Sequence, residues 1–550
     1  MKIAIAQIGT NPGKIEQNTN KILQWIDRAK DEGAEMVIFP ELTIPGYASM
    51  DLFLRDSYVE ENIQALKKIV KHCQGIKVFV GFVDVDRTRI RPDKKLHRYN
   101  SSAYIENGKI IALRDKTLIP EYDVFMEKRY FSTARQRDLI PIGDFKVGLQ
   151  ICEDIYTWGY PVNVTQEYAE RGMNIIINMS ASPFSIGKRK TRIEWIKAAT
   201  QFAKVPVIYA NTVGSYDGFE GQVVFDGRSQ VYNENGNLIA QGKAFQEDLI
   251  IFELSIKSDP EKDKVLVHYK DDDTRDVCDA LTLGLCEYAL RTGFKKAILG
   301  ISGGLDSAVV ACLAVDVFGP ENVTLLSLPT EFSSSETKND AQLISKNLNV
   351  TFSEISIQKI FEEYKNTLSA DFKNFPEIQS DTTFENIQSR IRGATLMAFA
   401  NRNGAILLNT GNKTELALGY CTLYGDMNGG ISVLGDISKA RVYELAHYLN
   451  RKSQRIPTSI IERTPTAELK PNQTDEQGLG AAYSVLSPLT EELVETDYDY
   501  DTLITKYPKN IVDSLILRIK INEFKRRQAP PAIRVTEKAF GIGRRIPIAY

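Results

Sequence analysis

The segment that best indicates the fold is AILGISGGLDS, residues 297–307, which joins a short apolar strand to the apolar helix pattern of residues 308–318. Two adjacent glycines let backbone N–H groups approach an anion, and the helix N-terminus supplies positive potential at the same place. Ser302 and Ser307 add hydroxyl donors, and Asp306 offers the oxygen ligand that Mg²⁺ prefers. The segment differs from the Gly-x-x-x-x-Gly-Lys-Ser/Thr loop of kinases and GTPases. It therefore predicts a phosphate-binding loop of another kind.

Strand and helix patterns alternate through the second half of the chain. Such alternation predicts a doubly wound parallel sheet, in which ligands bind beyond the carboxyl ends of the strands. Residues 300–307 lie at one such end, and residues 410–415 lie at another. We therefore expect a Rossmann-like α/β domain with its site at that edge of the sheet. The predicted elements are helices over 277–291, from 307 and from 336, and strands at 297–301, 323–328 and 406–409.

The first half also mixes β-rich runs with amphipathic helices, which predicts a second α/β domain. It ends in a predicted hairpin whose turn is Asn235-Gly236, a pair that accepts positive φ at both positions. The predicted strands are residues 3–7, 36–39, 78–83, 100–105, 146–151, 175–178 and 207–210, followed by the hairpin strands 230–232 and 238–240.

The length of the chain predicts two domains. It has 550 residues, whereas a single hydrophobic core usually stops growing at roughly 250 to 300 residues. The polar stretch 257–274, with the run Asp271-Asp272-Asp273, has the composition of a linker. We therefore place the domains at residues 1–260 and 275–550.

Composition argues against several classes of function. The chain is 43% hydrophobic and 25% charged, and its net charge of -3 gives no electrostatic footprint for nucleic acid. No apolar run is long enough to cross a membrane, and the N-terminus shows no secretion signal. The six cysteines have no Cys-x-x-Cys spacing and the four histidines do not cluster, so neither zinc nor disulfides are expected. We expect a cytoplasmic protein whose partners are small molecules.

Three chemically suited residues follow strand-like runs in the first half: Glu41, Lys116 and Cys152. A thiolate attacks an amide carbonyl well only if another group takes its proton and returns it to the leaving ammonia, and Glu41 suits that role. Lys116 suits a second role, because a fixed cation stabilises the negative oxygen of the tetrahedral intermediate. By itself, a cysteine at a strand end is more often a buried, inert thiol. The interpretation of Cys152 as a nucleophile therefore depends on all three residues together.

Together, the contexts FPEL around Glu41, RDKT around Lys116 and LQICED around Cys152 resemble the nitrilase superfamily over about 250 residues. The resemblance implies a four-layer αββα sandwich in which a Glu-Lys-Cys triad hydrolyses amides through a thioester. It also explains how a cysteine hydrolase can have so few histidines. The glutaminase branch of that family implies glutamine-binding roles for three further residues, Tyr122, Ser182 and Lys188. Without the family, Ser182 and the proline after it would be read as a turn.

The second half resembles the ATP pyrophosphatase superfamily, in which ATP adenylates a substrate and pyrophosphate leaves. The order of TGNKTE, residues 410–415, and LYGDMNGG, residues 423–430, after the SGGLDS loop narrows the resemblance to the NAD synthetase family. That family implies ATP, Mg²⁺ and deamido-NAD as ligands. The implied ATP-binding residues are Gly300, Ile301, Ser302, Gly303, Gly304, Leu305, Asp306, Ser307, Thr410 and Lys439. The implied deamido-NAD-binding residues are Asn386, Arg390, Glu415 and Lys525, and the implied magnesium carboxylates are Asp306 and Glu415.

Two segments leave other interpretations open. Lys525 to Arg527 is also compatible with a solvated basic helix end. After NQTDE, residues 472–476, many glutamine-dependent members carry Leu-Pro-Pro-Tyr-Asp and a later Asp, whereas this chain has LGAAYS at 479–484 and Ser487. That pattern is closer to the ammonia-dependent relatives. It leaves open whether this segment takes part in binding or in coupling.

Together, the two resemblances imply an enzyme that takes ammonia from glutamine and uses ATP to add it to deamido-NAD, and we expect it to form a homo-oligomer. Two other functions remain. One is a different amidotransferase of the ATP pyrophosphatase superfamily, against which stands the nitrilase-type first half. The other is a nucleotide-binding regulatory protein, which would lack a complete triad or lack Asp306 and Glu415, and this chain keeps all five residues.

Overall fold

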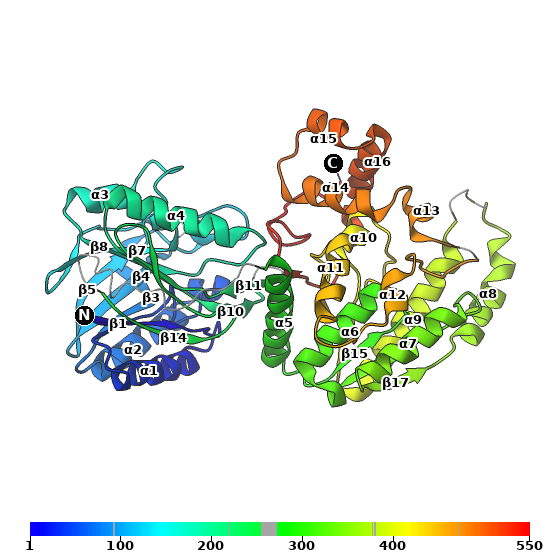
Figure 1. Cartoon of the computed structure of the whole chain (residues 1–550), viewed down its shortest axis with the longest axis horizontal. Helices are drawn as coiled ribbons and strands as arrows, with labels where there is room; N and C mark the ends of the chain where they lie inside the picture. Colours follow the sequence, from blue (N-terminus) through cyan, green and yellow to red (C-terminus); the bar gives the residue numbers. More distant parts are fainter. Residues whose placement is uncertain are drawn as a thin grey trace. The chain divides into compact units, whose positions relative to one another are not determined.

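The structure is a computed structural model of the whole chain and describes residues 1–91, 94–218, 221–254, 272–376, 378, 381–471 and 473–549. These residues form two compact units (Figure 1). Unit 1 comprises Met1–Phe219 and Val223–Asp271, and unit 2 comprises Glu220–Gln222 and Asp272–Tyr550. Most of the predicted linker, residues 257–271, lies outside the described residues.

Unit 1 contains two six-stranded sheets with the same internal plan. In each sheet three neighbouring inner strands run parallel and the outer strands pair antiparallel. The first sheet has the order β14 (Asp248–Glu253), β1 (Lys2–Gln7), β2 (Met36–Ile38), β3 (Lys77–Ile90), β4 (Leu96–Glu106), β5 (Lys109–Asp115). The second has the order β13 (Leu238–Gln241), β12 (Gln230–Tyr232), β9 (Val207–Asn211), β8 (Ile175–Ser180), β7 (Phe145–Ile151), β6 (Ile140–Ile142).

The two sheets pack face to face and helices cover their outer faces. One core cluster contains Ile5 and Phe79 from the first sheet together with Leu149 and Ile177 from the second. Helices α1 (Ile15–Asp31) and α2 (Asp56–His72) lie against the first sheet, and α3 (Val164–Glu170) and α4 (Lys188–Ala203) cover the second. In α1 the buried side chains recur every three or four residues, as an amphipathic helix requires. The predicted αββα sandwich is therefore confirmed.

The predicted hairpin is present, and its two strands begin at the predicted residues, with residues 233–237 between β12 and β13. The expectation of positive φ at both turn residues is wrong, because only Gly236 has it, at 76°. Asn233 helps to hold this loop, because its Oδ1 accepts hydrogen bonds from the N–H groups of residues 235 and 237 at 3.1 and 2.9 Å. Its backbone carbonyl also accepts the Gly236 N–H at 2.9 Å, so side chain and backbone together form the turn.

Unit 2 is built on a parallel five-stranded sheet, and the predicted doubly wound fold is confirmed. Its order is β17 (Thr351–Glu354), β16 (Val323–Ser327), β15 (Ala297–Gly300), β18 (Ile406–Asn409), β19 (Ile431–Ser432). The chain leaves β15 toward one edge of the sheet and later adds β18 on its other side. The strand order therefore reverses between the neighbouring strands β15 and β18, and such a switch point is where sheets of this kind bind ligands.

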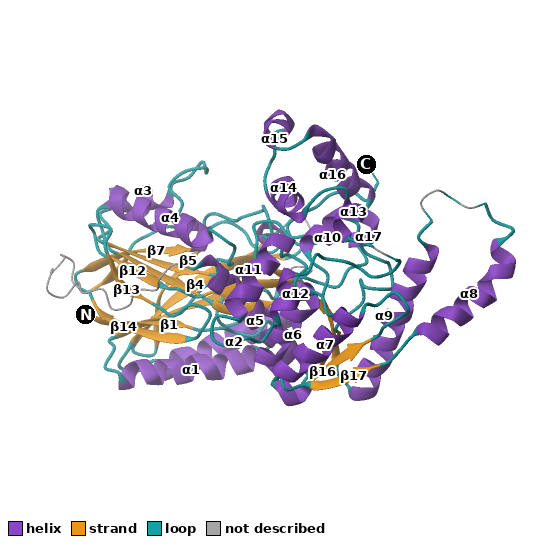
Figure 2. Ribbon diagram, turned by 45° about the vertical axis from the view of Figure 1, so that its right-hand side comes forward, coloured by secondary structure: helices purple, strands orange, loops and turns teal. Residues whose placement is uncertain are grey.

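Helices surround this sheet and continue into a helical layer near the C-terminus. Figure 2 shows that unit 2 is richer in helix than unit 1. A separate core cluster joins Leu418, Leu489 and Leu515 from three helices of this layer. The helices of unit 2 are α5 (Asp273–Thr292), α6 (Leu305–Phe318), α7 (Ser335–Asn347), α8 (Gln358–Phe372), α9 (Thr383–Asn403), α10 (Lys413–Leu418), α11 (Lys439–Leu449), α12 (Thr458–Glu462), α13 (Asp475–Leu479), α14 (Tyr483–Glu495), α15 (Tyr500–Lys506), α16 (Lys509–Ile521) and α17 (Glu523–Arg526). The remaining strands are β10 (Val213–Tyr216), β11 (Gln222–Asp226) and β20 (Ile533–Arg534).

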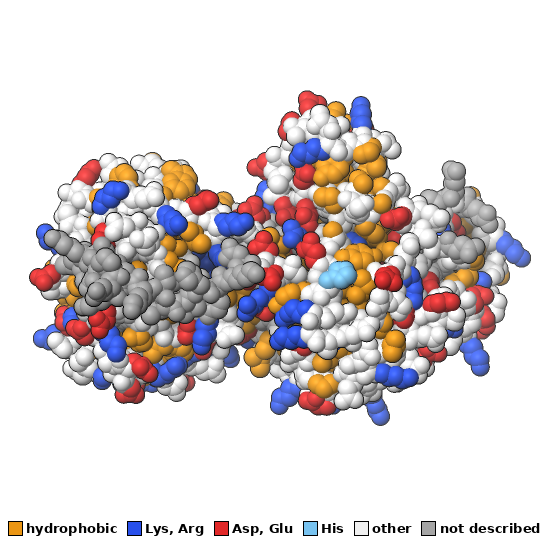
Figure 3. All heavy atoms as spheres, viewed as in Figure 1, with side chains coloured by type: hydrophobic (Ala, Val, Ile, Leu, Met, Phe, Trp, Pro, Cys, Tyr) orange, Lys and Arg blue, Asp and Glu red, His pale blue; other side chains and the backbone are white. Residues whose placement is uncertain are grey.

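Acidic and basic side chains are interspersed over the described part of the face shown in Figure 3. Of the helices in the described residues, none is both long enough and apolar enough to span a bilayer. All six cysteines are free thiols.

Candidate active sites

Cys152, the predicted nucleophile, lies at a sharp turn directly after β7 and begins the 3-10 helix η3 (Cys152–Ile155). Its backbone φ is 48°, a left-handed conformation that residues other than glycine rarely adopt. Its carbonyl accepts a hydrogen bond from Asn178 Nδ2 at 3.0 Å. The residue is 9% exposed. The strained turn therefore holds a largely buried thiol at a fixed position.

Lys116 bridges two buried carboxylates. Its Nζ donates to Glu41 Oε1 at 2.8 Å and to Glu127 Oε1 at 2.8 Å. Glu41 also accepts hydrogen bonds from Asn100 Nδ2 at 2.6 Å and from the Ala181 N–H at 2.9 Å. Because these charged groups are paired and hydrogen-bonded, they keep fixed positions although they are out of water.

Burial determines the proton affinities at this site. It raises the pKa of Cys152 well above the usual thiol range, and the Glu41 carboxylate adds to that shift. Burial also raises the pKa of Glu41, although the Lys116 ammonium partly offsets it. For Lys116, burial disfavours the charged form, but Glu127 and Glu41 outweigh burial and raise the pKa. The resting thiol is therefore protonated. The neighbouring Glu41 carboxylate has a raised proton affinity, which suits a general base that takes the thiol proton.

Asp154 connects the strand end at Lys116 with the turn at Cys152. Its buried carboxylate accepts hydrogen bonds from the N–H groups of residues 117–118 at 3.0 and 2.8 Å. It also accepts one from the Ile151 N–H at 3.1 Å. The first two residues follow Lys116 and the third precedes Cys152, so one side chain fixes the backbone of both segments.

The three residues expected to hold glutamine lie around the Cys152 turn. Tyr122 O–H donates to Oε1 of Glu153, the residue after the nucleophile, at 2.7 Å. Ser182 and the nucleophile line a cavity of about 10 Å³, room for about one water. The Lys188 ammonium lies over the Trp195 ring, 4.6 Å from its centroid, and Trp195 lines the same cavity. The structure thus brings Ser182 into the cavity and places the other two beside residues of the site.

The predicted phosphate-binding loop joins β15 to α6. Gly303 has φ 79°, and a Cβ at this position would lie 2.2 Å from Thr337 O, so only glycine fits there. Ser302 Oγ accepts a hydrogen bond from the Gly304 N–H at 3.1 Å, and Ser307 Oγ donates to Gly304 O at 3.0 Å. The two hydroxyls therefore hold the loop in shape.

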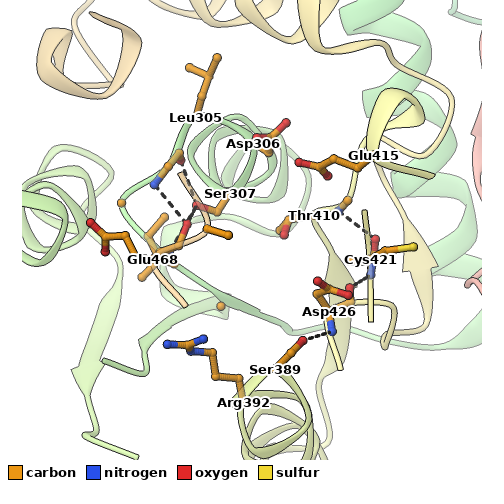
Figure 4. A pocket seen from close by; sticks show the side chains of 18 of the residues that line it. Leu305, Asp306, Ser307, Ser389, Arg392, Thr410, Glu415, Cys421, Asp426 and Glu468 are labelled. Carbon is orange, nitrogen blue, oxygen red and sulfur yellow. Dashed lines mark hydrogen bonds between the residues drawn. The ribbon is translucent and has the colours of Figure 1, made fainter. Parts of the chain in front are cut away.

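This loop lines a cavity of about 330 Å³, within the range of roughly 300 to 1,000 Å³ for ligand pockets. All eight residues 300–307 lie on its wall, as do Thr410 and Lys439. The other walls follow β16 and β18, so the cavity lies at the carboxyl ends of the central strands. Figure 4 shows Arg392 and Asp426 on the side of the pocket opposite Asp306 and Glu415.

The two predicted magnesium carboxylates, Asp306 and Glu415, face the same part of this cavity (Figure 4). Asp306 pairs with Lys439 through Oδ2 and accepts a hydrogen bond from Asn412 Nδ2 through Oδ1 at 2.9 Å. Asn412 also forms a capping box with Glu415, whose Oε2 accepts the Asn412 N–H at 3.1 Å. Burial and then the Asp306 charge raise the pKa of Glu415 to about 8. Two mutually repelling carboxylates are a fitting donor set for a divalent cation.

A magnesium ion commonly binds one or two protein carboxylates together with substrate phosphates. Within the part of the chain that the structure describes, no group of three or more His, Cys, Asp or Glu side chains could hold a metal ion. The pair Asp306 and Glu415 therefore fits a magnesium ion that arrives with ATP.

Asn386, Arg390 and Lys525, expected to bind the dinucleotide, are not among the residues that line the cavity. They hold the loop of residues 419–423, part of which does line it. Lys525 Nζ donates to two carbonyls of this loop at 2.8 and 2.9 Å. Arg390 Nε donates to a third at 3.2 Å, and Asn386 Oδ1 accepts from a loop threonine hydroxyl at 2.8 Å. In this structure they therefore shape one wall.

Ser487, part of the departure from the family pattern, lies behind the same cavity. Its buried Oγ accepts a hydrogen bond from the Ala440 N–H at 3.2 Å and lies 3.5 Å from Thr414 Oγ1. Thr414 Oγ1 in turn accepts the Lys439 N–H at 3.1 Å. The serine therefore supports the start of α11, the helix that carries Lys439. Asn472, in the preceding motif, lies outside the described residues.

Sequence reasoning missed three residues at these sites: Glu127, Asp154 and Asn412. Only Asn412 carried a usable signal, since Asn-x-x-Glu before a helix is a capping pattern. Asp154 was visible in the ICED motif, but nothing in the motif shows that it accepts three backbone N–H groups. Glu127 lies 11 residues after Lys116 in a segment without regular periodicity.

Two families match the chain. Residues 2–258 match the carbon-nitrogen hydrolase family, and residues 277–529 match the NAD synthase family. The first match includes Glu41, Lys116 and Cys152, and the second includes the SGGLDS loop and Glu415.

Relatives match the chain over its whole length. The chain is 39% identical over 556 residues to the glutamine-dependent NAD(+) synthetase of Synechocystis sp., covering 100% of this chain and 98% of the relative. It is 34% identical to that of Thermotoga maritima, with the same coverage. The solved structure of glutamine-dependent NAD+ synthetase from Acinetobacter baumannii in complex with ADP matches with a TM-score of 0.76 and 33% identity, covering 100% of this chain and 98% of that one. The chain therefore belongs to the family of glutamine-dependent NAD(+) synthetases.

Proposed function

We propose that this enzyme makes NAD in two reactions, hydrolysis of glutamine in unit 1 and ATP-dependent amidation of deamido-NAD in unit 2. The observation that carries the proposal is the presence of both sites in one chain. Unit 1 holds a thiol with a buried Glu-Lys pair, and unit 2 holds a phosphate-type loop beside two carboxylates. The relatives' printed name, glutamine-dependent NAD(+) synthetase, supports the same pair of reactions.

In the first reaction, Cys152 Sγ attacks the side-chain amide carbon of glutamine while Glu41 takes the thiol proton. Lys116 stabilises the negative oxygen of the tetrahedral intermediate. Glu41 then returns its proton to the leaving nitrogen, ammonia departs, and a thioester to Cys152 remains. Water, activated by Glu41, hydrolyses that thioester and releases glutamate.

In the second reaction, the carboxylate of the deamido-NAD nicotinate ring attacks the α-phosphorus of ATP, and pyrophosphate leaves. The product is an acyl adenylate, whose leaving group is a stabilised phosphate instead of an oxide. Ammonia then attacks the acyl carbon and AMP departs, which gives NAD. The roles proposed here are phosphate binding for residues 300–307, Thr410 and Lys439, and dinucleotide binding for the wall held by Asn386, Arg390 and Lys525.

Mg²⁺ is part of the proposal. Asp306 and Glu415 would hold it, and when bound it would neutralise charge that develops on the phosphates. Lys439 pairs with Asp306 in this structure, so the same lysine is positioned to contact a phosphate when Asp306 engages a cation.

One experiment separates the proposal from the other two functions. The purified protein is incubated with ATP, magnesium and glutamine, together with either deamido-NAD or XMP, and the nucleotides are separated by chromatography. NAD from deamido-NAD, without GMP from XMP, is the expected result. GMP would indicate a different amidotransferase, and the absence of both products would indicate a regulatory protein.

Three further properties remain proposals. We place the domain limits at 1–260 and 275–550, because the residues between them are mostly polar.

We propose a homo-oligomer, since soluble oligomers are commonly closed symmetric assemblies of one chain, and light scattering during size exclusion tests it. We propose a cytoplasmic location, in keeping with six free thiols, which fractionation of cells tests.

A further inference from the structure

Arg192, on α4, is a buried residue that the mechanism above does not use. It lines the small cavity beside Cys152 together with Ser182 and Tyr209. The arginine is 2% exposed. A guanidinium so far from water needs hydrogen-bond partners for its donors, so its position beside the nucleophile calls for an explanation.

Asp226 fixes the orientation of this arginine. Nη1 of Arg192 donates to Asp226 Oδ2 at 3.1 Å, and Nη2 donates to Asp226 Oδ1 at 3.0 Å. Such a two-point contact locks the plane of the guanidinium. Nη2 also reaches the carbonyl and hydroxyl oxygens of Ser182, each at 3.4 Å. The guanidinium is therefore held against Ser182, one of the residues expected to bind glutamine.

One donor of Arg192 is left over. Nε is buried and has no hydrogen-bond partner within the described part of the chain. An unpaired buried N–H on a cation is unfavourable, and its cost disappears when a ligand supplies an acceptor. The cavity of about 10 Å³ admits one small polar atom, which matches a carboxylate oxygen.

The surrounding charges indicate which ligand group fits. Lys188 is a second cation near this place: burial, and then the Arg192 charge, lower its pKa. The Glu153 carboxylate, on the residue after the nucleophile, accepts the hydroxyls of Tyr122 at 2.7 Å and Tyr160 at 2.6 Å. Cationic and anionic groups therefore both lie near the nucleophile. This combination suits a zwitterion, a molecule with one carboxylate and one ammonium.

We propose that Arg192 is a specificity-determining residue that binds the α-carboxylate of glutamine through Nε, with Asp226 and Ser182 holding the guanidinium in place. The inference rests on the proposed glutaminase function of unit 1 and deepens it. It explains how the enzyme selects glutamine over amides that lack an α-carboxylate.

The test compares two substrates in the complete enzyme, with ATP, magnesium and deamido-NAD present. Glutamine is one, and 4-aminobutanamide, the same molecule without its α-carboxylate, is the other. NAD formation, which consumes the ammonia released from each substrate, gives kcat/KM for each. In Arg192→Gln we expect kcat/KM for glutamine to fall about 100-fold, mainly through KM, because a charged hydrogen bond is lost. For 4-aminobutanamide we expect less than about a 3-fold change, because it makes no such bond.

Arg192→Lys and Arg228→Gln complete the design. The lysine keeps the charge but not the fork, so we expect about a 10-fold loss with glutamine and none with the analogue. Arg228 is a second buried arginine that pairs with Asp226, at 3.5 Å, but it does not line the cavity. Its variant controls for removal of buried charge, and it should treat both substrates alike.

Two outcomes would overturn the inference. Equal losses with both substrates in both Arg192 variants would make the arginine a purely structural residue, and unchanged kcat/KM values with both substrates would give it no role. NAD formation from ammonium salts by the variants shows that the protein is folded. Failure of the proposed function itself appears separately, as wild-type protein that releases no ammonia from glutamine.

Discussion

The two candidate sites differ in how their charges are satisfied. In unit 1, Lys116 lies between Glu41 and Glu127; all three are buried, and Lys116 donates a hydrogen bond to each carboxylate. In unit 2, the cavity is about 330 Å³, against about 10 Å³ beside Cys152. There Asp306 pairs with Lys439, and Lys525 bonds to carbonyls of a neighbouring loop. In the first site the charged groups already have the arrangement that the proposed reaction needs. In the second site the charged groups have internal partners, which ligands would replace on binding.

The difference follows from the chemistry that each site is proposed to perform. Amide hydrolysis transfers protons over short distances, so acid, base and nucleophile must be fixed beforehand. Adenylation brings a large polyanion and a dinucleotide together, so the protein charges must exchange internal partners for phosphates and metal. Mutations at the unit 1 site should therefore lower NAD formation from glutamine alone. Mutations at the unit 2 site should lower NAD formation from both glutamine and ammonium salts.

The largest effect is expected for Cys152→Ala. Removing a covalent nucleophile should lower NAD formation from glutamine by at least about 10⁴-fold, while formation from ammonium salts continues. The measurement is NAD production with each nitrogen source. Cys286→Ser, at a partly buried cysteine on α5 of unit 2, is the control. Equal loss with both sources would refute the separation of the two sites.

Asp306→Ala and Glu415→Ala should lower NAD formation with either nitrogen source by about 10³-fold. Each removes a carboxylate proposed to hold the Mg²⁺ that neutralises the charge developing on the phosphates. Chelating magnesium with EDTA should reproduce the loss in the wild type, and added Mg²⁺ should reverse it. Asp316→Asn, at the other end of α6 and paired with Arg455, is the matched control. A variant with near-normal ammonia-dependent activity would remove its residue from the proposed metal site.

Glu127→Gln tests whether the second carboxylate on Lys116 matters. The amide cannot carry the charge that balances Lys116, so we expect kcat for ammonia release from glutamine to fall about 100-fold. KM should change little, since Glu127 bonds to Lys116, Asn100 and Tyr47 rather than lining the cavity. Glu121→Gln, which removes an exposed pair with Lys128, is the control. Loss of ammonia-dependent synthesis as well would point to unfolding.

The smallest effect is expected for Lys525→Ala. It removes two hydrogen bonds to the loop of residues 419–423, so KM for deamido-NAD should rise about 10-fold with either nitrogen source. Steady-state kinetics with varied deamido-NAD measure this, and Lys520→Ala, on the neighbouring helix, is the comparison. An unchanged KM would show that the loop needs no support from Lys525.

Much of the fold followed from local patterns. The SGGLDS loop, the strand before it and the apolar helix after it lie within a few residues of one another, so the sequence shows them directly. The same holds for β2 and β7, which precede Glu41 and Cys152. Among the strands that went unrecognised, β17 has no buried residue. Such strands carry little hydrophobic alternation to read.

The sequence by itself predicted the nucleophile, its base and cation and the phosphate loop, and it indicated the family to which the chain belongs, because each depends on residues close together in a motif. Only the tertiary structure decided which distant groups complete those motifs. Glu127 reaches Lys116, Arg192 and Asp226 meet beside Ser182, and Asn386, Arg390 and Lys525 converge on one loop. The physical reason is that a buried charge needs partners wherever the folded chain supplies them, and spacing along the sequence does not record where that is.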